Sequence, residues 1–208
     1  MDQNLQDIAD KIIKYLDQKK VQYCDVRADQ QIKKSALIEN NEIEHITDNE
    51  NKGVGVRLIK NGTWSFCSIT NPNSFDEIKN ILDNTIKNSD YRNIDNKKIK
   101  LHSNPVNKRE INFPVLKKPE IEELIKIGFE CNKIISDTPK IIKSITNASH
   151  TVNSKYFTNS EGSEILQNFT DVIMEMVATA HESGQTQSVN ITEGGRGGLE
   201  LITNKIQQ

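Results

Sequence analysis

The sequence has few residues of the kinds that build metal or redox sites. Only three cysteines occur in 208 residues, and Cys24, Cys67 and Cys131 lie too far apart in sequence to form a zinc-ligand or redox pair. His181-Glu182 resembles the start of a zinc-peptidase motif, but no second histidine follows at helical spacing. We therefore expect no catalytic, cofactor-binding or metal-binding residue in this chain. Isolated thiols that fill space fit a reducing, cytoplasmic compartment.

An excess of charge and a long apolar run are also missing. The chain carries 27 basic and 29 acidic residues, a net charge of −2 and a pI near 6.1. Without a basic block, direct binding to nucleic acid is not expected. No stretch is long and apolar enough to cross a membrane, and the first sixteen residues mix acids with apolar side chains, unlike a secretory signal. The composition therefore predicts neither nucleic-acid nor membrane contact.

Alternating and helical apolar patterns fill most of the chain. Helical spacing predicts helices over residues 3–18, from Ser74 onwards, and from Pro119 onwards. Asn61-Gly62 stands between two alternating runs, which is typical of a type I′ hairpin. Further strands are predicted over residues 23–29, 32–38, 43–47, 141–146, 155–158, 164–169, 172–180 and 185–191. The expected fold class is α+β: an N-terminal lobe of helix and antiparallel sheet, followed by a helix and an antiparallel β meander.

Composition changes along the chain predict its domain organisation. Residues 1–90 form a first domain, and residues 119–200 form a central region of one helix and the β meander. The intervening residues 91–118 are rich in Asn, Lys and Pro, which is typical of a linker or crossover. Residues 201–208 are expected to be a truncated tail. The strand over residues 172–180 is expected to present an uncovered edge.

Two side-chain patterns need a choice between a structural and a binding role. Trp64 and Phe66 alternate along one strand, so they share a sheet face, and we expect them to pack in the core rather than to stack on a ligand. His45 stands in the middle of a strand beside Glu44, and a solvent-facing position is expected.

The glycine-rich segment Gly194, Gly195, Arg196, Gly197 and Gly198 is the most unusual stretch. It lacks the lysine and hydroxyl residue of a P-loop and the glycine spacing of a dinucleotide fingerprint. Glycines permit positive φ and close approach of two backbones, whereas the planar guanidinium of Arg196 suits a carboxylate. We expect these five residues to form the backbone passage out of the last strand and to contact a subunit interface or a substrate. A flexible tether with a solvated arginine remains the alternative.

Two long stretches resemble the TldD/PmbA family of metallopeptidases, also called modulators of DNA gyrase. The stretch "GVGVRLIKNGTWSFCSI" resembles the strand–hairpin–strand of its N-terminal domain, and "FTNSEG…NITEGGRGGLE" resembles its central region. Ser65 and Cys67 depart mildly from this pattern, because small residues are usual there. The order and spacing fit over about residues 5–200.

The resemblance implies a zinc peptidase in which an H-E-x-x-x-H helix binds the metal and its glutamate acts as general base. That motif is expected beyond the glycine-rich segment, so no catalytic residue is carried over to this chain. Zinc is implied for the full-length family member alone. The resemblance also implies a homo- or heterodimer with a family member and a peptide substrate for the full-length protein.

Three interpretations of the chain follow. It is the N-terminal, non-catalytic part of such a peptidase, with a role in the substrate cleft and subunit interface. Alternatively, it is a stand-alone binding or assembly module that pairs with a full-length relative, or an interrupted reading frame.

Overall fold

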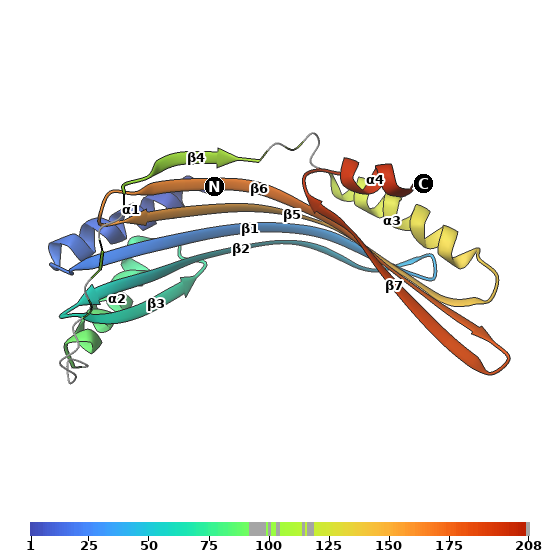
Figure 1. Cartoon of the computed structure of the whole chain (residues 1–208), viewed down its shortest axis with the longest axis horizontal. Helices are drawn as coiled ribbons and strands as arrows, with labels where there is room; N and C mark the ends of the chain where they lie inside the picture. The colour runs from blue at the N-terminus through green and yellow to red at the C-terminus, as the bar shows by residue number, and fades with distance from the viewer. Residues whose placement is uncertain (92–98, 100, 103–104, 114, 116–118, 207–208) are drawn as a thin grey trace. The chain divides into compact units, whose positions relative to one another are not determined.

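The structure is a computed structural model that describes residues 1–91, 99, 101–102, 105–113, 115 and 119–206. These residues form four helices and seven strands, which confirms the α+β class. The strand order of the sheet is β3-β2-β1-β5-β6-β4, and β7 also pairs with β6 (Figure 1). The chain divides into two compact units: unit 1 holds Met1–Gln31, Asn51–Asn112 and Ser154–Asn168, and unit 2 holds Ile32–Glu50, Phe113–Asn153 and Phe169–Gln208.

Unit 1 packs two helices against sheet strands. Helix α1 (Gln3–Gln18) begins after Asp2, whose side chain accepts a hydrogen bond from the Asn4 N–H. It buries one stripe of apolar residues, as its helical spacing predicts. Helix α2 (Phe75–Tyr91) adds its own stripe. The strands complete the core of the unit, which includes Leu5, Ile8, Ile12, Leu16, Val26, Val54, Val56, Leu58, Ile78 and Leu82.

The strands β1 (Tyr23–Glu39), β2 (Glu42–Lys60) and β3 (Thr63–Thr70) include the predicted hairpin. Asn61 and Gly62 have φ values of 53° and 77°, and Lys60 pairs with Thr63. Both turn residues therefore adopt the positive φ that a type I′ turn needs, which confirms this prediction.

Unit 2 has a smaller core between its helices and the strands β5 and β6. Helix α3 (Ile121–Ser136) and the short α4 (Glu200–Ile206) pack on β6 (Glu164–Glu182) through the buried residues Leu124, Ile127, Cys131, Val172, Met174 and Ile202. Helix α3 begins at Ile121, near Pro119 as predicted, after an extended Glu120 whose N–H donates to the Glu123 carboxylate.

The strands are longer than the alternating pattern predicts. Residues 23–29 and 32–38 belong to one strand, β1, and the predicted meander has three strands in place of five: β5 (Ile141–Asn159), β6, and β7 (Gln185–Arg196). The break expected between the predicted strands 141–146 and 155–158, where "VNS" at Val152–Ser154 is typical of a turn, is wrong because these residues continue β5. Their polar side chains have partners on β6: Ser154 Oγ donates to Asn168, and Asn153 Nδ2 donates to Asp171.

The structure differs from the prediction at one strand edge and at one aromatic side chain. Residues 172–180 are not an uncovered edge, because β7 pairs along them and the other side of β6 faces β5. Phe66 is 66% exposed, so its predicted core packing is wrong, whereas Cys67 packs against the core of unit 1. Trp64 does share a face with Phe66, and His45 is exposed as expected.

The segment predicted as a linker, 91–118, is partly outside the described residues. Its described part contains the strand β4 (Lys108–Asn112), which pairs in parallel with residues 164–168 at the start of β6.

Candidate functional site

The glycine-rich segment first continues the last strand, β7, and then leads into helix α4. Gly194, Gly195 and Arg196 pair with Ile173, Val172 and Asp171 in the antiparallel β6–β7 ladder. The chain leaves the ladder only after Arg196. The expected passage out of the strand is therefore limited to Gly197 and Gly198.

Gly194 is required by the close approach of β6. Its φ is 143°, and a Cβ atom there would collide with the Val172 carbonyl oxygen and lie 2.9 Å from the Ile173 Cα. A side chain at this position would have to move backbone, not a flexible side chain. The glycine thus fixes how closely β7 lies against β6 immediately before Arg196.

Arg196 is held by one carboxylate and two aromatic rings. Its Nε lies 3.3 Å from Asp171 Oδ1, directly across the ladder. The guanidinium carbon lies 4.0 Å from the centroid of the Phe169 ring and 4.9 Å from that of Phe113. The two rings meet edge to face, with centroids 6.3 Å apart. Stacking of this kind orients the guanidinium plane without consuming its N–H donors.

The two residues after Arg196 are also tied down. The Gly197 N–H donates to the Thr170 carbonyl oxygen at 2.9 Å, and the Gly198 N–H donates to the Glu200 carboxylate at 2.9 Å. A Cβ atom on Gly197 would lie 2.9 Å from Leu201 Cδ1, on the first turn of α4. These contacts describe an ordered connection between β7 and α4.

A pocket of about 540 Å³ lies on this part of unit 2. It is lined by Asp171, Ile173, Thr192, Glu193, Gly194, Gly195 and Arg196. Among the residues that the structure describes, Asp171 is the acceptor engaged by the guanidinium, through Nε. A guanidinium has five N–H donors, so the Nη edge of Arg196 can still bind a carboxylate or a peptide carbonyl.

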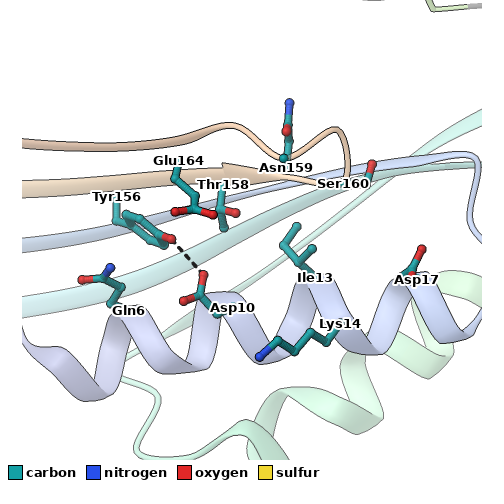
Figure 2. A pocket seen from close by; sticks show the side chains of 11 residues that line it. Gln6, Asp10, Ile13, Lys14, Asp17, Tyr156, Thr158, Asn159, Ser160 and Glu164 are labelled. Atoms are coloured by element: carbon teal, nitrogen blue, oxygen red, sulfur yellow. Dashed lines mark hydrogen bonds between the residues drawn. The ribbon is translucent and has the colours of Figure 1, made fainter. Parts of the chain in front are cut away.

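A second pocket, of about 480 Å³, lies between α1 and the β5–β6 turn of unit 1 (Figure 2). Within it the Tyr156 hydroxyl donates to Asp10 Oδ1 at 2.8 Å, and burial raises the pKa of Tyr156 well above its usual value. Glu164 faces the same space and is paired with Lys108 at 2.8 Å. No local pattern predicts this pocket, because its walls come from α1 and from the distant residues 156–164.

The turn beside this pocket explains the "NSEGS" stretch. Asn159 Oδ1 accepts hydrogen bonds from the N–H groups of Glu161 and Ser163, and Gly162 has a φ of 94°. Ser160 Oγ accepts from the Cys24 N–H at 3.1 Å. The stretch therefore has a structural role as the closure of the β5–β6 turn.

The His181-Glu182 pair and Cys24 have structural surroundings. His181 Nδ1 lies 2.9 Å from Thr186 Oγ1, and Glu182 pairs with Lys140, so the His-Glu pair belongs to the β6–β7 turn. Burial raises the pKa of the Cys24 thiol to about 12. Within the described ranges, no three His, Cys, Asp or Glu side chains are placed to hold a metal ion. These residues do not fit the zinc site that the resemblance implies for a full-length member.

The helices of the described residues are all too short or too polar to span a membrane.

Two family models match successive parts of the chain. The PmbA/TldA metallopeptidase domain 1 matches residues 24–89, and the PmbA/TldA metallopeptidase central domain matches residues 114–206. The chain belongs to the PmbA/TldD family. The central-domain match of this PmbA/TldD member includes the whole glycine-rich segment and its partners on β6. A comparison with curated proteins gave no match.

Solved structures share the fold of this PmbA/TldD chain at low identity. A candidate modulator of DNA gyrase from Bacteroides thetaiotaomicron aligns with a TM-score of 0.75 and 15% identity, over 100% of this chain and 49% of that one. A similar protein from Thermotoga maritima gives 0.68 and 12%, over 91% and 42%. TldE from Thermococcus kodakarensis gives 0.66 and 14%, over 90% and 42%. The chain thus spans a little under half of each related structure.

Proposed function

We propose that this chain supplies the N-terminal, non-catalytic part of a PmbA/TldD-type metallopeptidase, and that Arg196 contacts its peptide substrate. The observation that carries the first part is the match to domain 1 and the central domain, in order, by a chain that spans 42–49% of its solved relatives. Peptide cleavage itself belongs to the assembled enzyme in this proposal.

The geometry around Arg196 supports a peptide contact. Asp171 and the rings of Phe169 and Phe113 hold the guanidinium in one orientation, so little side-chain entropy is lost when a ligand binds. The pocket beside it offers the Nη donors of Arg196 to a peptide carboxylate or carbonyl oxygen. Arg196 would therefore position an extended peptide rather than react with it.

Zinc and a partner subunit complete the proposed enzyme. When bound, zinc would activate water and polarise the scissile carbonyl. The described residues do not fit that metal, and none of the steps assigned to them involves it. Pairing with a family member is proposed because β7 lies at the margin of the described sheet and exposes Val189 and Ile191.

The peptide contact can be tested with a fluorescein-labelled hexapeptide of mixed sequence, followed by anisotropy. Arg196→Lys keeps the charge but loses the planar fork, so we expect a Kd about tenfold higher. Arg109→Lys, at an exposed arginine of β4, is the matched control and should leave the Kd unchanged. Equal affinity for all three proteins would reject the role of Arg196.

The stand-alone assembly module is the second candidate, and the exposed strand β7 favours it. Sedimentation velocity of the chain mixed with a full-length PmbA/TldD member distinguishes the two roles. A stable complex with unchanged peptide affinity supports the module. A complex that also binds the peptide more tightly supports the substrate-binding half.

A further inference from the structure

A second arginine cluster lies on unit 1, around a carboxylate that solvent does not reach. Asp25 on β1 is fully buried. Its Oδ1 lies 2.6 Å from Arg27 Nη1, and its Oδ2 lies 2.7 Å from Arg57 Nη2 on β2. Arg57 Nε also donates to Oδ2 at 2.8 Å. One carboxylate thus holds two guanidinium groups, which leaves a net charge of +1 in the cluster.

Both guanidinium groups also lie over aromatic rings. The Arg57 guanidinium carbon is 5.3 Å from the Trp64 ring, and that of Arg27 is 5.2 Å from the Phe157 ring. Trp64 stacks on Phe66 with centroids 6.1 Å apart and an interplanar angle of 24°. The Tyr23 ring meets the Trp64 ring edge to face, with centroids 6.0 Å apart. We call Tyr23, Arg27, Arg57, Trp64 and Phe66, with Asp25 beneath them, the arginine–aromatic surface.

The core of unit 1 does not account for this surface. Along β3, Cys67 and Ile69 pack on the core, whereas Phe66 leaves two-thirds of its side chain in solvent. The side chains of Arg27 and Arg57 are 50% and 38% exposed. Asp25 engages Nη1 of Arg27 and Nε and Nη2 of Arg57, so other N–H donors of both guanidinium groups are not used by this carboxylate.

We propose that the arginine–aromatic surface binds an acidic peptide segment in which a carboxylate stands next to an aromatic side chain. The ligand carboxylate would accept hydrogen bonds from the two prepositioned guanidinium groups and offset the charge of +1. The adjacent ring would pack on Phe66 and Trp64. Arginine, tryptophan and tyrosine are the residues that contribute most to binding in protein interfaces, and this surface combines all three.

A peptide is favoured over a nucleic acid by the charge of the chain. The net charge of −2 repels a polyanion, whereas a single carboxylate needs only the local positive charge. The surface lies in unit 1 and the Arg196 pocket lies in unit 2, so this proposal does not depend on the proposed role of Arg196.

Trp64 provides the assay, because it is the only tryptophan of the chain. The full chain is titrated with acetyl-Gly-Glu-Phe-Gly-amide while the tryptophan emission is followed. We expect a saturable change in emission. Added salt should weaken the binding, because the peptide carboxylate and the two guanidinium groups are solvent-accessible before they pair. Acetyl-Gly-Lys-Phe-Gly-amide and acetyl-Gly-Glu-Ser-Gly-amide should bind at least about tenfold more weakly.

Variants test whether the site is the one proposed. Phe66→Ser removes an exposed ring and leaves the core intact, and Arg27→Gln removes one guanidinium while Arg57 keeps Asp25 paired. Each should raise the Kd about tenfold. Arg109→Gln, at an exposed arginine outside this surface, should leave this titration unchanged. The proposal is overturned if the three peptides bind alike, if Phe66→Ser has no effect, or if a single-stranded octathymidylate binds more tightly than the Glu-Phe peptide.

Discussion

Asp171 and Arg196 lie opposite each other in the β6–β7 ladder, with Arg196 Nε 3.3 Å from Asp171 Oδ1. Asp171 is held in turn by Asn153 on β5, whose Nδ2 donates to Oδ2 at 3.3 Å. Three strands therefore fix the position of one half-exposed guanidinium. Because a surface ion pair contributes at most about 1 kcal/mol to stability, the arrangement matters more for orienting Arg196 than for holding the fold.

Replacing Gly194 by alanine should destabilise the chain. The positive φ and the collision of a Cβ with the Val172 carbonyl oxygen both oppose any side chain. We expect a loss of about 2 kcal/mol or more in the free energy of unfolding, measured by urea denaturation. Gly55→Ala is the control, because no atom lies within 4 Å of a Cβ there. Equal stability of the two variants would show that β7 does not approach β6 as described.

Removing the Asp25 carboxylate, which is buried beneath the arginine–aromatic surface, should destabilise the fold. Asp25→Ala leaves Arg27 and Arg57 facing each other without their shared partner, so we expect a loss of about 3 kcal/mol. Asp29→Ala changes an exposed residue of the same strand and should alter stability by less than about 0.5 kcal/mol. Thermal or urea unfolding followed through Trp64 measures both. A small loss in Asp25→Ala would mean that the carboxylate does not hold the two arginines.

The Tyr15–Asp83 hydrogen bond predicts a dependence of stability on pH. The Tyr15 hydroxyl, 2.6 Å from Asp83 Oδ1, is the main cause that lowers the pKa of Asp83 below its usual 3.8. A carboxylate with a lowered folded-state pKa stabilises the fold above its unfolded pKa, and this contribution is lost as the pH falls through the folded value. Tyr15→Phe should therefore cost about 1 kcal/mol at pH 7 and progressively less below pH 3.8.

The matched comparison for Tyr15→Phe uses Asp83→Asn as the background. In that background the carboxylate is gone, so the effect of Tyr15→Phe should not change with pH. If the cost of Tyr15→Phe in the unmodified chain is the same at pH 7 and at pH 3, the carboxylate is not the partner that matters.

The three thiols should react slowly in the folded chain. Burial raises the pKa of Cys24 to about 12 and also raises the pKa values of Cys67 and Cys131, so little thiolate exists at pH 8. Ellman's reagent should therefore titrate three thiols rapidly only after unfolding in guanidinium chloride. A thiol that reacts fully within seconds in the folded protein would contradict the burial described for it.

Local patterns predicted the elements whose signals lie within one segment. Asn61-Gly62 sets its own turn through positive φ, and the apolar stripe of α1 sets its buried face. Local patterns could not predict that two short predicted strands form one long strand. Asn153 and Ser154 resemble turn residues in sequence, yet partners on β6, fourteen or more residues away, allow them to continue β5.

The same limit applies to the candidate site. Glycine chemistry and the planar guanidinium single out the segment around Arg196 from sequence. Its partners Phe113, Phe169 and Asp171 come from other segments, and no local pattern links them to it. The prediction for Phe66 failed for a related reason. Alternation shows that Phe66 and Trp64 share one face of the strand, but it does not show whether other residues cover that face.

Amide hydrogen exchange over residues 194–198 measures whether the glycine-rich segment is an ordered, peptide-contacting part of the chain. The Gly197 N–H bonds to Thr170 and the Gly198 N–H bonds to Glu200, so both should exchange much more slowly than in an unfolded chain. Adding the mixed-sequence hexapeptide should slow exchange further in the unmodified chain and not in Arg196→Lys. Exchange at unfolded rates, unchanged by the peptide, would show that the segment is only a tether.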